Sequence, residues 1–168
     1  CEAEAWVAFV HEAEKRLTGA AAAIDRESDG LIGERLTAGD FKGKLQEICV
    51  LYPRGGLKAR CILVAGLGKR SEFRLETVRA ASAAAAQKAR ALDLRTLALP
   101  IDVRTIRLAP PDLAEAVVEG VALGLYRFDA YRTQDTAEGA NPAQVILAVE
   151  NGKSRRAVEA AVKRAEIV

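Results

Sequence analysis

The sequence contains no methionine, a single histidine and few aromatic residues, and each shortage excludes something. Without a methionine, Cys1 is not a natural translation start, so we expect this chain to be part of a longer protein. One histidine, with no H-E-x-x-H or C-x-x-C pattern, gives no zinc-site or catalytic-triad signature. Aromatic residues make up 5% of the chain, which leaves few platforms on which nucleic-acid bases could stack.

The chain has neither a large excess of one charge nor a long apolar run. It carries 25 basic and 23 acidic residues, a net charge of +2, and so lacks the one-signed field typical of nucleic-acid binders. No apolar run approaches the roughly 20 residues that cross a bilayer, and the amino terminus lacks a secretory signal pattern. We therefore expect a cytoplasmic protein with no membrane contact.

Cysteine is scarce as well, and its odd count argues against a disulfide scaffold. Cys49 and Cys61 are equally distant in sequence from Gly55, which lies in a predicted turn at 53–56. If the strands on either side pair as a hairpin, the two side chains would face each other. Reduced, buried thiols are the favoured state in a cytoplasmic protein.

The pattern of apolar residues predicts alternating strands and helices. Strands are expected at 5–10, 46–52, 59–65, 95–101 and 144–149, and helices at 20–36, 74–92, 113–126 and 154–166. The first helix should be interrupted near Gly30 or Gly33, and a polar loop should span 38–44. This alternation predicts a single three-layer α/β domain over residues 1–168, with helices flanking a mixed or largely parallel sheet.

The helix predicted at 113–126 has two informative features. Asp112 is placed to cap its free amides, with Glu115 three residues later reaching back. Gly120 and Gly124 lie one turn apart, although an interior glycine costs about 1 kcal/mol relative to alanine. We expect backbone or a bulky side chain to approach closely there, because the flanking charges disfavour a membrane dimer motif.

The stretch ILVAGLGKR, residues 62–70, runs an apolar strand into a glycine corner with a lysine, as many phosphate-binding loops do. The dinucleotide pattern fails because Ser71 replaces its third glycine, and the Walker pattern fails at Leu63 and Arg70. A steric need for glycine in a strand–turn–helix corner is the favoured explanation. The residues kept as candidates for contact with an anion or a partner are Gly66, Gly68, Lys69, Lys42 and Lys44.

Carboxylates are plentiful, but none forms an obvious metal or acid–base constellation. Those that fit the solvated side of a helix or an exposed edge are Asp25, Glu27, Asp29, Glu12 and Glu14. The lone His11 fits a surface or capping role. Ligands can converge from distant positions, so the sequence leaves a metal site open.

Several phrases occur together in a specific order: LTGAAAAID at 17–25, GDFKGK at 39–44, LYP at 51–53, ILVAGLGKRSEF at 62–73 and EGVALGLYRFDAYRT at 119–133. In this combination the chain resembles the amino-terminal domain of the leucyl (cytosol) aminopeptidase family over almost its whole length. Two departures from the family pattern are mild. Ala65 stands where valine is expected, and Cys49 and Cys61 occupy strands that are usually aliphatic.

The resemblance implies a macro-domain-like fold in which the glycine corner belongs to the architecture. It also implies that peptide hydrolysis belongs to a carboxy-terminal catalytic domain outside this sequence, which would hold two divalent metal ions, Mn or Zn. No catalytic or metal-binding residue is carried over, so this chain alone is expected to be inactive and to hold no cofactor. Its expected partners are that catalytic domain and further copies in a hexamer.

Two alternatives of a different class stay open. Macro domains bind ADP-ribose with a glycine loop that follows a strand, and residues 66–69 could imitate that loop. A DNA-binding surface is the other alternative, which the near-balanced charge disfavours.

Overall fold

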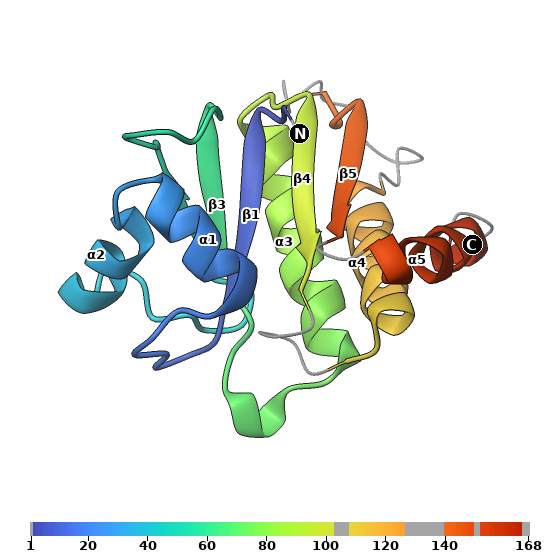
Figure 1. Cartoon of the computed structure of the whole chain (residues 1–168), viewed down its shortest axis with the longest axis horizontal. Coiled ribbons are helices and arrows are strands. Elements are labelled where there is room, and N and C mark those ends of the chain that lie inside the picture. Colours follow the sequence, from blue (N-terminus) through green and yellow to red (C-terminus); the bar gives the residue numbers. More distant parts are fainter. Residues whose placement is uncertain (1, 103–107, 127–139, 150–151, 166–168) are drawn as a thin grey trace, which may run out of the picture.

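The computed structural model describes residues 2–102, 108–126, 140–149 and 152–165 (Figure 1). Its strands are β1 (Ala5–Val10), β2 (Ile48–Leu51), β3 (Cys61–Gly66), β4 (Thr96–Ile101) and β5 (Gln144–Val149). Its helices are α1 (Gly19–Glu27), α2 (Leu31–Ala38), the short 3-10 turn η1 (Arg70–Glu72), α3 (Leu75–Ala91), α4 (Pro110–Leu125) and α5 (Gly152–Ala165). The segment quoted at 119–133 lies outside the described residues beyond Tyr126, as does the last residue of the helix predicted at 154–166. No helix in the described ranges is both long and apolar enough for a bilayer crossing.

The strands form one five-stranded sheet in the order β2-β3-β1-β4-β5. β2 runs antiparallel to β3 and every other neighbouring pair is parallel, which confirms the predicted mixed sheet. The inner strands are almost entirely buried, as expected where a parallel sheet has apolar contacts on both faces. The carboxyl ends of β1, β3, β4 and β5 meet along one edge, the carboxyl edge, where open α/β sheets bind their ligands.

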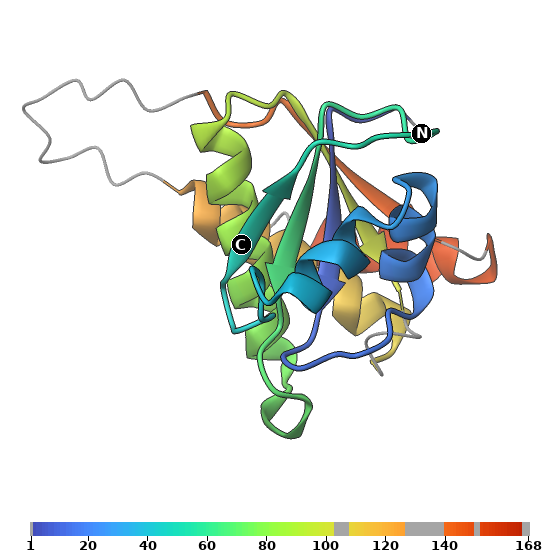
Figure 2. The same ribbon diagram turned by 90° about the vertical axis from the view of Figure 1, so that its left-hand side faces the viewer.

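Helices flank the sheet in two layers, which confirms the three-layer prediction (Figures 1 and 2). α1 and α2 lie on one face, and α3 and α4 cover the opposite face. α3 approaches the sheet closely because its inward side consists mostly of small residues. The buried residues of α3 are Val78, Ala81, Ser82, Ala85, Ala86 and Ala89.

The predicted interruption of the first helix is confirmed at Gly30, which separates α1 from α2 with a left-handed φ of +78°. Asp25 stabilises the second helix across this break. Its Oδ1 accepts hydrogen bonds from the backbone N–H groups of Ile32 (2.8 Å) and Gly33 (3.0 Å). The expectation that Asp25 is merely solvated is therefore wrong, because the chain reversal points α2's unpaired amides at its carboxylate.

The start of α4 differs from the sequence prediction. The helix begins at Pro110, with Ala109 in the capping position, so Asp112 lies in the first turn and does not act as the cap. Proline is favoured there because its fixed φ suits a helix and its missing N–H needs no partner. Two consecutive prolines therefore start the helix earlier than the capping pattern predicts.

α3 and α4 pack closely along the two glycines of α4. A Cβ atom added to Gly120 would lie 2.4 Å from the Arg79 carbonyl oxygen, and one added to Gly124 would lie 2.6 Å from that of Ala83. The Arg79 guanidinium also forms an ion pair with Glu119, so a polar contact borders the apolar one. The predicted close approach at these glycines is confirmed, and the partner is the backbone of α3.

Candidate functional site

The glycine corner at the end of β3 lies at the carboxyl edge, but its backbone amides are already hydrogen-bonded within the chain. The Gly66 N–H donates to the Glu47 carbonyl oxygen (2.8 Å) and the Gly68 N–H donates to that of Gly43 (3.0 Å). Between them, the Leu67 N–H donates to the carbonyl oxygen of Val10 (2.9 Å). A phosphate-binding loop needs amides that point at the ligand, and these three do not.

The glycines of two distant segments meet because backbone passes directly over backbone. A Cβ atom at Gly66 would lie 1.9 Å from the carbonyl oxygen of Lys44, and one at Gly43 would lie 2.5 Å from that of His11. Distances this short leave no room for any side chain. The GDFKGK loop is therefore pressed against the GLGK corner, and we call this contact the loop–corner contact.

The candidate lysines lie beside this contact. The backbone N–H groups of Lys42 and Lys44 donate hydrogen bonds to the Glu47 carboxylate (3.2 and 2.9 Å). The Glu47 side chain therefore already occupies the position at which these amides could bind an external anion. Both lysine side chains are exposed, and Lys69 is exposed with its Nζ 3.6 Å from the Glu72 carboxylate. The structure thus gathers the candidate segments at one edge, and contact of Lys42 and Lys44 with a partner remains a prediction.

His11 lies beneath the glycine corner and is only 2% exposed, so the expected surface position is wrong. Its Nδ1 is 3.3 Å from the Gly68 carbonyl oxygen, and its ring packs edge-on against Phe73 with centroids 5.3 Å apart. The Glu14 side chain is buried as well. Its carboxylate accepts a hydrogen bond from the His11 backbone N–H (2.9 Å) and forms an ion pair with Arg70 (2.8 Å). The loop after β1 packs against the glycine corner and the residues that follow it. This packing buries the side chains of His11 and Glu14, which their sequence position alone predicts to be exposed.

Asp102, which is not among the candidate residues predicted from the sequence, is a buried carboxylate at the carboxyl end of β4. It is 6% exposed, and its Oδ2 accepts the Ala20 N–H (2.6 Å) in the first turn of α1. A Cβ atom at Gly19 would lie 1.8 Å from that oxygen, so this glycine is required for the contact. The carboxylate complements the positive end of the helix dipole. The sequence signal that could have identified Asp102 is its position as a single acidic residue directly after the apolar run LALPI.

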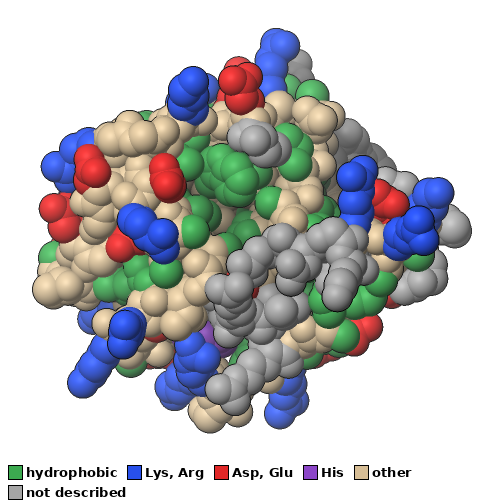
Figure 3. All heavy atoms as spheres, in the orientation of Figure 1, with side chains coloured by type: hydrophobic (Ala, Val, Ile, Leu, Met, Phe, Trp, Pro, Cys, Tyr) green, Lys and Arg blue, Asp and Glu red, His purple; other side chains and the backbone are tan. Residues whose placement is uncertain are grey.

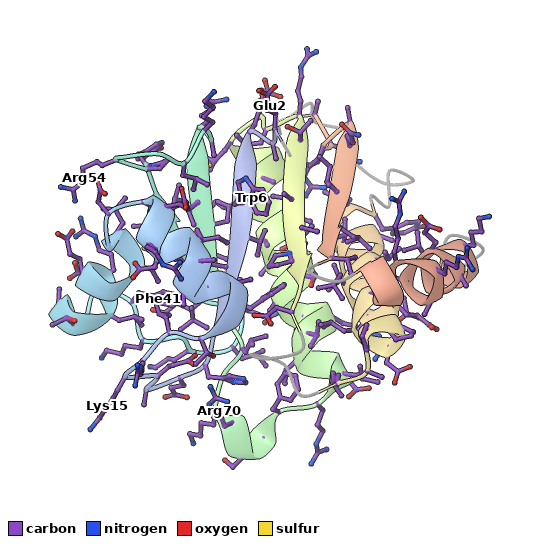
Figure 4. All side chains as sticks on the ribbon, viewed as in Figure 1. Glu2, Trp6, Lys15, Phe41, Arg54 and Arg70 are labelled. Carbon is purple, nitrogen blue, oxygen red and sulfur yellow. The ribbon has the colours of Figure 1, made fainter. Side chains whose placement is uncertain are left out.

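A hollow of about 250 Å³ lies next to Asp102, between α1 and the sheet. Its lining is almost entirely apolar: Trp6, Gly19, Ala20, Ala23, Ile24, Pro100, Ile101, Asp102, Ala148 and Val149. Figure 4 labels Trp6, which lies on β1 and lines this hollow. The hollow suits apolar groups far better than phosphates or metal ions.

The carboxylates at this edge do not fit a two-metal centre. Asp102 and Glu47 accept backbone N–H groups, and Glu14 pairs with an arginine. Within the ranges that the structure describes, no group of three or more His, Cys, Asp or Glu side chains could hold a metal ion.

The strands around the predicted turn do pair as an antiparallel hairpin, but the two cysteines do not face each other. The register places Cys49 opposite Val64, while Leu51 already pairs with Ile62. Cys49 packs against the core under α1 and α2, whereas Cys61 belongs to the core on the opposite face. The hairpin is asymmetric about Gly55, so equal sequence distances do not produce a cross-strand pair. Burial raises the pKa of both thiols above the ordinary 9.0.

We expect Cys61→Ala to flatten the loss of stability at alkaline pH. A thiol whose pKa is raised by folding keeps its proton in the native state after the unfolded chain has lost it. Stability is thus fully retained below pH 9 and falls above it, by at most about 1.4 kcal/mol per pH unit for each thiol. Urea unfolding between pH 7 and 10.5 measures this slope.

Cys49→Ala is the matched control, because Cys49 lies on the edge strand and is only partly buried. Its slope should change less than that of Cys61→Ala. Equal slopes in wild type and Cys61→Ala would contradict the burial of an uncharged thiol at position 61.

Comparison with known proteins decides the family. The model for "Cytosol aminopeptidase family, N-terminal domain" matches residues 7–135. The chain belongs to the cytosol aminopeptidase family. This family domain is 29% identical over 157 residues to a "Probable cytosol aminopeptidase" of Alkaliphilus oremlandii, covering 94% of the chain and 32% of that relative. The chain therefore spans about a third of the relative's length.

Two solved structures support the fold of this cytosol aminopeptidase domain. A mutant of tomato leucine aminopeptidase superposes with a TM-score of 0.69 at 20% identity, over 99% of the chain and 33% of that protein. A Trypanosoma brucei macrodomain in complex with ADP-ribose superposes with a TM-score of 0.69 at 15% identity, over 96% and 64%. The macro-domain-like fold expected from the resemblance is confirmed.

Proposed function

We propose that residues 1–168 form a single noncatalytic domain of a metal-dependent aminopeptidase that releases amino-terminal residues from peptides. The observation that carries the proposal is the family match to an amino-terminal domain, in a chain that spans about a third of its relative. The name of that relative, a cytosol aminopeptidase, supports a cytoplasmic location for the parent protein.

In this proposal the chemistry lies in a carboxy-terminal catalytic domain. Two divalent ions, Mn or Zn, would there activate water against the peptide carbonyl. This chain contributes no catalytic residue and no metal ligand. At its carboxyl edge the amides and carboxylates that could bind a substrate instead fix one loop to another. Its role is structural: it supports a hexamer and frames the region of the active site.

Hydrolysis of a leucine chromogenic amide, with Mn²⁺ or Zn²⁺ added, tests the proposal. We expect turnover by the full-length parent and none by residues 1–168 at equal concentration. Loss of turnover after chelation, and its return with the metal, would support metal dependence. Turnover by residues 1–168 alone would overturn the proposed role, because this chain would then itself carry a metal-dependent site.

The fold would also suit a nucleotide-binding module, since a macrodomain of similar fold was solved with ADP-ribose. The loop–corner contact argues against that function at residues 66–69, because Gly66, Leu67 and Gly68 donate their amides within the chain. We expect millimolar ADP-ribose to leave the amide NMR shifts of these three residues unchanged. Saturable shifts confined to the corner would instead favour the nucleotide module. DNA binding has less support, because the net charge is only +2.

A further inference from the structure

One half of the sheet has helices on a single face. On the side of α3 and α4, Leu97, Leu99 and Ile101 of β4 are buried in the core. On the other side α1 and α2 contact residues of β1, β2 and β3. No described helix lies over β4 and β5 on that side (Figure 1). Parallel strands are normally covered on both faces, so in the described part of the chain this half of the sheet lacks a helical layer.

The register defines the apolar surface of this half of the sheet, which we call the Trp6 face. Trp6 of β1 pairs with Ala98 of β4, and Ala98 pairs with Ile146 of β5. The next row contains Pro100 and its partner Ala148. Side chains two apart on a strand share a face, so these five residues form one apolar surface across three strands.

The Trp6 face is both apolar and partly open. Trp6, Ile146 and Ala148 are only partly buried, although Trp6 lies on the central strand of the sheet, whereas Ala98 and Pro100 between them are buried. The hollow of about 250 Å³ beside it is bordered by α1. Figure 3 shows hydrophobic side chains gathered around the middle of this view, where Figure 4 labels Trp6. None of the five residues is charged, so the surface fits an apolar protein segment and not a polyanion.

We infer that the Trp6 face is the surface on which the carboxy-terminal part of the parent polypeptide packs, with a large apolar side chain entering the hollow. The inference rests on the proposed function. It is supported by length: about two-thirds of the Alkaliphilus relative lies beyond the matched part, so a large body of chain is available to supply the missing layer. An apolar sheet face in an otherwise two-sided architecture requires such a layer.

Hydroxyl-radical footprinting of Trp6 tests the inference, because Trp6 is the only tryptophan in the chain. Its oxidation rate is compared, by mass spectrometry, between the full-length parent and residues 1–168. We expect oxidation to be roughly fivefold slower in the parent, since the core of an interface excludes water. Tyr52, 66% exposed beyond the end of β2, is the internal reference and should change much less.

A pair of charge substitutions separates packing from a general change in the protein. In the parent, Ile146→Glu places a carboxylate on the Trp6 face and should restore the fast oxidation of Trp6. Leu123→Glu is the matched control, because Leu123 is 68% exposed on α4 on the opposite side of the sheet, and should leave Trp6 protected. Neither substitution should alter Trp6 oxidation in residues 1–168.

The outcomes distinguish this inference from the proposed function. Equal Trp6 oxidation in both proteins, with leucine amide turnover by the parent, would overturn the inference and leave the proposed function standing. Trp6 protection without turnover would reject the peptidase and still support the packing surface. Protection that increases with the concentration of residues 1–168 would overturn the inference in favour of a second copy of this chain.

Discussion

Gly66→Ala is expected to lower the free energy of unfolding by about 3 kcal/mol or more, which would leave a marginally stable domain largely unfolded. The added Cβ atom would lie 1.9 Å from the Lys44 carbonyl oxygen, and both groups belong to backbone that is hydrogen-bonded on either side. The loop–corner contact cannot yield without breaking those bonds. Urea unfolding followed by far-UV circular dichroism measures the loss.

Gly39→Ala is the control for this substitution. Gly39 has a φ of +78°, yet nothing lies within 4 Å of an added Cβ atom, so only the left-handed backbone opposes the alanine. That strain costs about 1–2 kcal/mol. A Gly66→Ala variant no less stable than Gly39→Ala would show that the GDFKGK loop is not pressed against the corner.

The double substitution Gly120→Ala with Gly124→Ala is expected to destabilise the domain by about 3 kcal/mol. On an exposed helix each change from glycine to alanine would instead add about 1 kcal/mol of stability. The sign reverses because the new methyl groups would meet the backbone of α3 at 2.4 and 2.6 Å, which forces the two helices apart. Thermal and urea unfolding both report the effect.

Ala122→Gly on the exposed side of α4 provides the opposite case. It removes a methyl group that contacts solvent and should cost about 1 kcal/mol through helix propensity alone. If the double alanine variant were as stable as wild type, α3 and α4 would have to be able to separate freely, contrary to the close packing described above.

Helices and strands with a regular apolar pattern were predictable from the sequence, because burial of one face requires apolar or small residues at many regularly spaced positions. The small-residue stripe of α3 and the apolar runs of β1 and β4 each satisfy a single burial pattern over many positions. Single residues decide the ends of elements and are harder to foresee. The strand predicted at 46–52 begins only at Ile48, because Gln46 has a left-handed φ of +64°.

The site residues were harder to predict, since their surroundings come from distant parts of the chain. The glycine corner was visible in the sequence, but nothing local shows that Lys44 passes over Gly66. His11 and Glu14 follow a strand, a position that is usually exposed, and are buried by a loop some 60 residues later in the chain. The Cys49–Cys61 prediction failed because hairpin register depends on loop geometry as well as sequence distance.

The sheet order also determines how this chain acquires its fold during synthesis. β1 precedes the other four described strands in the chain but occupies the centre of their sheet, so it can pair with β3 only after β3 has emerged, and it gains its second neighbour only with β4. Until then the apolar side chains of its sequence AWVAFV have no neighbouring strand to pack against. Parallel pairing over such separations closes long loops and is slow, which lengthens the exposure of this segment. Pairing of this central strand therefore has to wait for residues 61–66 and then 96–101 to be synthesised.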